Sequence, residues 1–187
     1  MQAEDMAAKD PDGALRYAMG QQDVSTRFRA LAAVALALAV SKPAEARQAA
    51  GQAQALIRYD QQLNNLDMAH AAGKLGKAWE KLGARAEARA FVTRLLDFAD
   101  QRAASFDATY RAAPEDADKF GPQTAKTKVF MASQLEVSEP SYVVQDIYSL
   151  AGEVDFDLAR HRLQSLPCDI LLPLTTAQVA ATYRRVK

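Results

Sequence analysis

Three lysines, Lys74, Lys77 and Lys81, recur at intervals of three and four residues near the middle of the chain. On an α-helix this spacing places their ammonium groups along one face. Such a row of cations can bind anionic groups of a partner molecule, and the usual alternative is a solvated helix face. The spacing therefore indicates noncovalent binding as the chemistry to look for in this region.

The residues that most often carry covalent or acid–base chemistry are few and scattered. Neither of the two histidines, His70 and His161, has a nucleophile or a carboxylate partner close to it in the sequence. Cys168 is the single cysteine, so it cannot form an intrachain disulfide, and with two histidines it does not make a Cys/His zinc site. We predict that the protein is not an enzyme and uses no cofactor and no metal.

Acidic residues gather in the segment APEDADKFGPQ, residues 113–123. Glu115, Asp116 and Asp118 lack the glycine turn and the terminal glutamate of a calcium-binding loop. The prolines and the glycine of this segment are typical of an irregular connection. We therefore expect a solvated acidic loop here and not a cation site.

The overall charge and hydropathy of the 187 residues limit the classes of partner. Lysine plus arginine and aspartate plus glutamate both total 23, and this balance argues against a nucleic-acid binder. The apolar run over residues 30–40 is half the length of a membrane-spanning helix, which needs about 20 residues. It also follows an acidic segment that suits a signal peptide badly. We predict no membrane insertion and a cytoplasmic location.

Alanine supplies 39 of the residues, which favours an all-α fold with closely packed helices. We expect a disordered or frayed N-terminus over residues 1–10, helical-hairpin repeats over 11–112, the irregular loop over 113–123, and C-terminal helical repeats or a cap over 124–187. Within these regions, breaks at proline and glycine predict helices over residues 11–20, 24–41, 43–59, 62–82, 85–104 (with helical character continuing to 111), 124–135, 141–150 and 156–166, and a last one from about 173. We expect Asp10 to begin the first helix, Asp23 or Ser25 to cap the second, and Asp155 to cap the helix over 156–166.

A short segment occurs twice. KLGARAEARA, residues 81–90, repeats the pattern of AVSKPAEARQ, residues 39–48, at an offset of 42 residues. Superposition of the two copies aligns residues at helical spacing on both sides of a tight turn. Each copy therefore predicts a helix, a turn and a second helix, a unit that buries its apolar face only when neighbours stack on it.

The second copy resembles a tetratricopeptide repeat over residues 69–102. The residues that carry the resemblance are Leu75, Gly76, Trp79, Gly83, Ala88, Val92 and Leu95. Asp100 stands where the family has a proline, and the first copy, residues 27–60, keeps only Ala46. The resemblance implies a right-handed superhelix of antiparallel helical hairpins. It also implies a concave groove lined by the first helix of each repeat, here at His70, Gly73, Lys77, Glu80 and Lys81.

The same groove positions, moved back by 42 residues, fall on apolar side chains: Phe28, Leu31, Ala35, Leu38 and Ala39. The packing positions of that helix, Ala30, Ala33, Ala37 and Val40, are apolar as well. A helix that is apolar on all sides is a buried helix, so something must cover it. The candidates are a segment of this chain (around residues 174–183 or 124–136), a second copy of the protein, or an amphipathic helix of a partner.

These observations predict a noncatalytic scaffold or adaptor that binds a protein or peptide partner on its concave surface, as part of a longer chain or alone. The expected binding residues are Phe28, Leu31, Leu38, His70, Lys77, Glu80 and Lys81. The alternative is a helical regulatory domain that encloses a small apolar molecule. An open groove favours the first function, and a closed apolar pocket favours the second.

Overall fold

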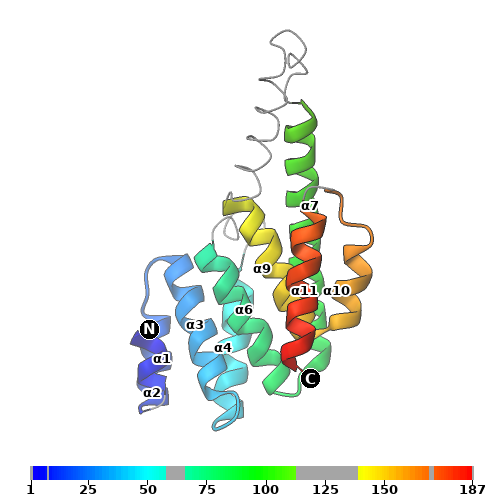
Figure 1. The fold of residues 1–187 in the computed structure, drawn as a ribbon. Helices are drawn as coiled ribbons and strands as arrows, with labels where there is room; N and C mark the ends of the chain where they lie inside the picture. Colours follow the sequence, from blue (N-terminus) through cyan, green and yellow to red (C-terminus); the bar gives the residue numbers. More distant parts are fainter. Residues whose placement is uncertain (1, 8, 58–65, 113–138, 169–170, 187) are drawn as a thin grey trace. The chain divides into compact units, whose positions relative to one another are not determined.

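The computed structural model describes residues 2–7, 9–57, 66–112, 139–168 and 171–186. In these ranges the chain forms α-helices joined by short turns, and no strand occurs among them (Figure 1). The predicted all-α class is therefore confirmed. The chain divides into two compact units, Met1–Leu95 and Leu96–Lys187.

Unit 1 contains the helices α1 (Gln2–Ala7), α2 (Pro11–Met19), α3 (Val24–Leu38), α4 (Pro43–Leu56) and α6 (Leu66–Lys81), and the first turns of α7 (Arg85–Ala112). The expectation that residues 1–10 fray is wrong for α1. Its alanines Ala3 and Ala7 are buried, and α1 packs against both α2 and α3. Burial of these small apolar side chains stabilises a helix that is too short to be stable alone.

The starts of three helices follow directly from the sequence. The Asp10 carboxylate accepts a hydrogen bond from the Gly13 N–H at 2.8 Å and caps α2. The Asp23 carboxylate accepts from the Thr26 N–H at 2.7 Å and caps α3. Pro43 occupies the first turn of α4, where its missing N–H leaves no bond unmade. All three starts were predicted from these residue types.

Gly83 ends α6 in the way that its position predicts. Its φ is +68°, in the left-handed region that favours glycine. The Gly83 N–H donates to the Glu80 carbonyl at 2.9 Å, and the Ala84 N–H donates to the Trp79 carbonyl at 3.0 Å. This pair of bonds is a Schellman motif, which satisfies the last carbonyls of the helix and turns the chain towards α7.

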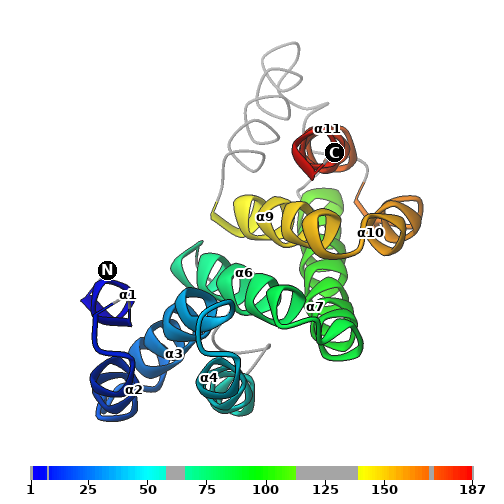
Figure 2. The same ribbon diagram turned by 90° about the horizontal axis from the view of Figure 1, so that it is seen from below.

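Helix α3 is the centre of unit 1. It packs against α1, α2, α4 and α6, which adjoin it in Figures 1 and 2. Its side chains Phe28, Leu31 and Leu38 are at most 1% exposed. On the α4 side, the helices approach through fully buried alanines of α4: Ala46, Ala49, Ala50 and Ala53. The prediction that this helix is buried on most of its circumference is confirmed.

One detail of that prediction is wrong. Ala37 and Val40, expected to pack, are exposed, and Val40 is 79% accessible. Within unit 1, the helices that cover α3 are α1, α2, α4 and α6. The predicted 124–136 segment lies outside the described residues. The C-terminal helix α11 (Leu172–Val186) packs on helices of unit 2, namely α9 (Glu139–Val154) and α10 (Phe156–Leu163).

Side chains join α4 to the end of α6. The Trp79 indole N–H donates to the Gln54 Oε1 atom at 3.0 Å, and the Arg47 Nη2 atom donates to the Leu82 carbonyl at 3.2 Å. Trp79 is 7% exposed and belongs to the core of unit 1. Helices α4 and α6 are therefore linked by directional bonds as well as by packing.

Unit 2 is formed by the remainder of α7 with α9, α10 and α11. Asp155 caps α10 as predicted, because its carboxylate accepts from the Leu158 N–H at 3.0 Å. The largest fully buried side chains of unit 2 are Tyr148, Leu96, Ile147 and Leu171, and Cys168 is buried as well. The predicted loop 113–123 and the predicted helix 124–135 lie outside the described residues.

The border between the units falls inside α7, between Leu95 and Leu96. Helix α7 extends to Ala112, one residue beyond the predicted continuation of helical character to residue 111. No glycine or proline occurs between Arg85 and Ala112, so nothing in the local sequence interrupts the helix. The change of composition after residue 112 marks the end of a helix, whereas the border of the units depends on how the chain packs.

Candidate ligand pocket

A pocket of about 390 Å³ lies in unit 1 among α1, α2, α3 and α6. Its apolar lining consists of small side chains, Ala3 of α1, Ala30 and Ala33 of α3, and Ala71 of α6. These alanines leave space between the helices because they lack the long side chains that would fill it. The volume is within the range of about 300–1,000 Å³ that is typical of ligand sites.

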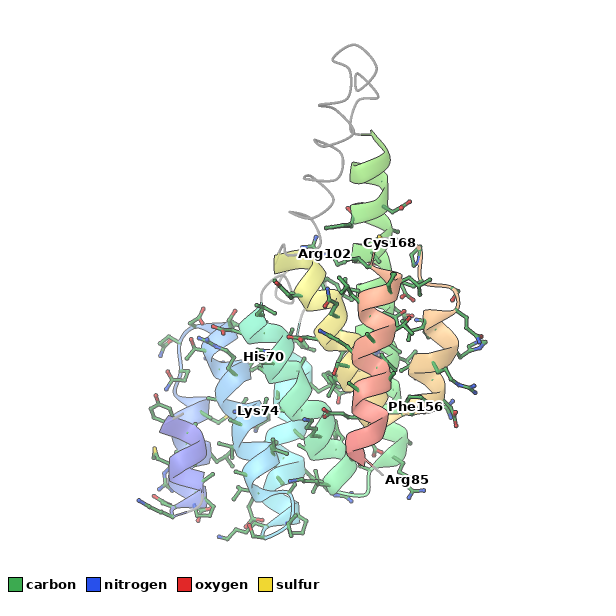
Figure 3. All side chains as sticks on the ribbon, in the orientation of Figure 1. His70, Lys74, Arg85, Arg102, Phe156 and Cys168 are labelled. Carbon is green, nitrogen blue, oxygen red and sulfur yellow. The ribbon has the colours of Figure 1, made fainter. Side chains whose placement is uncertain are left out.

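The polar lining of the pocket comes from three of the helices: Tyr17 of α2, Thr26 and Arg29 of α3, and Asp67, His70 and Lys74 of α6. On α6 the three residues follow one another at intervals of three and four, so they share a face. Figure 3 shows His70 and Lys74 on this helix. Two permanent cations, one carboxylate and one histidine therefore surround the pocket.

An ion pair joins α3 and α6 at the pocket. The Arg29 Nη1 atom lies 3.1 Å from the Asp67 Oδ2 atom, and the Arg29 Nη2 atom donates weakly to the Thr26 hydroxyl at 3.4 Å. The side chains of Arg29 and Asp67 are 43% and 74% exposed, so water reaches both partners. Hydrated ion pairs of this kind contribute little to stability, and their partners can be exchanged.

Arg29 also acts on the start of its own helix. The pKa of the Asp23 carboxyl is held below its usual value mainly by the hydrogen bond from the Thr26 N–H, and the positive charge of Arg29 lowers it further. A second carboxylate therefore lies within the electrostatic reach of the guanidinium, outside the lining of the pocket. Arg29 therefore interacts electrostatically with the carboxylates of both Asp67 and Asp23.

The predicted binding residues fall into three groups. His70 lines the pocket and is exposed. Lys77, Glu80 and Lys81 are on the same helix, with Lys77 partly exposed and the other two exposed, but none of them lines the pocket. Phe28, Leu31 and Leu38 are buried in the core, where a partner cannot reach them in this conformation.

The offset of 42 residues explains the third group. It selects the face of α3 that contains Phe28, Leu31 and Leu38, whereas the pocket is lined by the face that contains Thr26, Arg29 and Ala33. Sequence reasoning therefore missed Arg29, and it missed Asp67 and Tyr17 as well. The available signal was the spacing of Asp67, His70 and Lys74, which extends the lysine row towards the start of α6.

Unit 2 contains a second group of polar side chains, on α7, α9 and α10. The Tyr148 hydroxyl donates to the Asp100 Oδ1 atom at 2.5 Å, and Arg162 forms ion pairs with both Asp97 and Asp100. Burial raises the pKa of the Asp100 carboxyl, and the hydrogen bond from Tyr148 opposes this rise. Burial, and then the same hydrogen bond, raise the pKa of the Tyr148 phenol, so the phenol remains protonated at neutral pH. These contacts join helices and indicate a structural role.

The other candidates for chemistry remain apart. His161 is exposed on α10, and the Cys168 thiol is buried. Among the residues that the structure describes, no three histidine, cysteine, aspartate or glutamate side chains come together as a metal site would require. None of the described helices combines the length and the apolar character needed to cross a membrane.

Comparison of the chain with protein-family models, with curated proteins and with solved structures finds no match. The structure by itself defines the chain as a helical protein, with a pocket among α1, α2, α3 and α6 that is lined in part by charged side chains.

Proposed function

We propose that the protein is a noncatalytic binding module of the tetratricopeptide-like class, which holds a protein or peptide partner on the face formed by α1, α3 and α6. The observation that carries this proposal is the pocket. Its lining comes from α1, α3 and α6, which would be the first helices of three successive hairpins, with Tyr17 of α2 at its side. In a solenoid of helical hairpins, these first helices form the concave binding surface.

The packing of unit 1 supports this assignment. Helix α1 packs on α2 and α3 packs on α4, while α3 also packs on α1 and α6. A stack of hairpins requires both kinds of contact, within each pair and between first helices of consecutive pairs. The turn at Gly83 and the buried Ala88 at the start of α7 fit the same repeat pattern. We propose a right-handed superhelix on these grounds.

The alternative, a domain that encloses a small apolar molecule, fits the lining less well. Arg29, Asp67 and Lys74 border the pocket, and an apolar ligand would remove water from these groups without replacing its hydrogen bonds. A peptide offers carbonyl, amide and charged groups to the same residues. The volume alone does not separate the two functions, because it suits a small molecule and also a few side chains of a peptide.

The proposal is tested by selection of peptides from a random display library against the full chain. Peptides that survive selection are then titrated against the chain and against the double variant Lys77→Glu, Lys81→Glu. We expect the variant to bind about tenfold more weakly. The two positive charges beside the pocket, which attract anionic groups of a peptide, become negative charges that repel them. Arg85→Glu with Arg89→Glu is the matched control, since both arginines are exposed on α7, four residues apart, and away from the pocket.

Thermal unfolding of both double variants shows whether the fold is retained. A selection that yields no binding peptide contradicts the proposed function. Equal loss of affinity in the Lys77, Lys81 variant and in the control contradicts the assignment of the binding face. An unchanged affinity in the Lys77, Lys81 variant would show that the two lysines are part of a solvated helix face and do not contact the peptide.

A further inference from the structure

The ion pair between Arg29 and Asp67 shows what kind of group the pocket accepts. The guanidinium of Arg29 has five N–H donors in a planar fork that matches the two oxygens of a carboxylate. Asp67 and Thr26 each accept from one of its terminal nitrogens, and the arginine side chain keeps 43% of its surface accessible. A carboxylate from outside could therefore approach Arg29 from the solvent side.

The charges of the lining favour an anionic ligand. Arg29 and Lys74 carry two positive charges and Asp67 carries one negative charge, so these three side chains sum to +1. His70 lies between Asp67 and Lys74 on α6 and lines the same pocket. The alanine walls bring a bound chain close to these groups, because Ala30, Ala33 and Ala71 project only a methyl group.

We propose that the ligand of this pocket is an acidic peptide segment, and that Asp67 is a built-in competitor for the Arg29 guanidinium. This inference rests on the proposed peptide-binding function and adds the chemistry of the ligand. An aspartate or glutamate of the peptide replaces the Asp67 carboxylate on Arg29, while Lys74 contacts a second acidic group. Asp67 is 74% exposed, so its carboxylate is already largely hydrated and stays in water when it is displaced from Arg29.

The competition has a direct consequence for affinity. In the proposed mode, an incoming carboxylate breaks the contact between Arg29 and Asp67, and the Asp67 carboxylate remains beside the acidic ligand and repels it. Removal of this one negative charge is therefore expected to tighten binding. This outcome is unusual for substitution of a residue that lines a binding site, and a purely structural role of the ion pair would not produce it.

The test uses the full chain, one peptide recovered by the display selection, and an analogue of that peptide in which every aspartate and glutamate is replaced by asparagine or glutamine. For Asp67→Asn we expect the Kd of the acidic peptide to fall by about two- to fivefold and the Kd of the amide analogue to stay unchanged. For Arg29→Gln we expect the preference for the acidic peptide over its analogue to shrink, with the remainder due to Lys74, whereas an undiminished preference would contradict the role of Arg29.

Asp12→Asn is the matched control. Asp12, like Asp67, is exposed in the first turn of a helix of unit 1, but it does not line the pocket. We expect this variant to bind both peptides with the affinity of the natural chain. Its melting temperature also shows how much stability the loss of one acidic residue from a first turn costs.

The outcomes separate the two proposals. Selected peptides that lack acidic residues, or that bind as well after their carboxylates become amides, overturn the acidic ligand and leave the peptide-binding function in place. Weaker or unchanged binding of the acidic peptide to Asp67→Asn overturns the role of Asp67 as a competitor. Failure of the selection to yield any binding peptide overturns the proposed function and this inference with it.

Discussion

The two units stabilise their cores in different ways. In unit 1, α3 is surrounded by neighbouring helices and packs on α4 through small and apolar side chains. Two directional bonds at the edge of this core join α4 to the end of α6. In unit 2, Tyr148, Asp100 and Arg162 form a polar cluster that joins three helices. The difference teaches that an alanine-rich helical protein can define its packing either by close approach of backbones or by directional side-chain bonds.

Each kind of core has its own weakness. Close packing of small residues leaves no space for an added group, so that a larger or charged side chain disturbs the whole contact. A half-buried polar cluster tolerates a change of size better, but it depends on the protonation of its members. The three predictions below test this contrast, from the largest expected effect to the smallest.

Leu38→Asp should have the largest effect. Leu38 is 1% exposed on α3, so the substitution removes a buried leucine and places a carboxylate where no partner is available. We expect a loss of at least about 4 kcal/mol in the free energy of unfolding, measured by urea denaturation followed by circular dichroism. Ala37→Asp is the matched control, because Ala37 is the exposed neighbour on the same helix. Similar stability of the two variants would contradict the central position of α3.

Ala88→Leu should have an intermediate effect. Ala88 is 2% exposed near the start of α7, and the added volume must displace its neighbours, which typically costs about 1–3 kcal/mol. Ala90→Leu, two residues along the same helix, places the same side chain in solvent and should be nearly neutral. The melting temperatures of the two variants make the comparison. Equal melting temperatures would show that the surroundings of Ala88 are not closely packed.

The smallest effect is a pH dependence confined to unit 2. Burial raises the pKa of Asp100 above its usual value near 3.8, so the folded protein holds this proton more tightly than the unfolded chain does. The contribution of Asp100 to stability is therefore complete below about pH 4 and is lost as the pH rises through the raised pKa. Relative to Asp100→Asn, which has no such titration, the natural protein should become less stable as the pH rises from about 4 through the raised pKa of Asp100.

Hydrogen exchange of backbone amides locates this effect. The difference between the natural protein and Asp100→Asn should change with pH in α9 and α10, whose side chains contact Asp100, and stay constant in α3. Tyr148→Phe sharpens the test, because it removes a hydrogen bond that lowers the pKa of Asp100 and so extends the change to higher pH. A difference that is independent of pH would show that Asp100 behaves as an ordinary exposed carboxyl.

The sequence alone predicted the features of this fold that depend on neighbouring residues. Asp10, Asp23 and Asp155 each cap the helix that begins one residue later, and Gly83 ends α6, because each of these roles is decided within a few residues of chain. The burial of α3 followed from the apolar character of all its faces. The all-α class followed from the same local signals together with the high alanine content.

The features that depend on distant residues were not accessible in this way. Arg29 and Asp67 are 38 residues apart in the chain, and Tyr148 and Asp100 are 48 residues apart. The rotation of each helix about its axis decides which side chains meet across such distances, and the offset of 42 residues selected a face of α3 that is buried in the core. Only the part of the pocket on α6 could be predicted from the sequence, since His70 and Lys74 share one helix face with the lysine row.

The bond from Arg47 to the Leu82 carbonyl makes the end of one helix depend on its neighbour. When α4 separates from the unit, the carbonyl just beyond α6 loses its donor and the Trp79 indole loses Gln54 at the same time. The last turn of α6 should then fray together with α4, so that the two helices open as one cooperative unit and not one after the other. Arg47 thus couples two neighbouring helices, and the strength of that coupling sets how far a local opening spreads through unit 1.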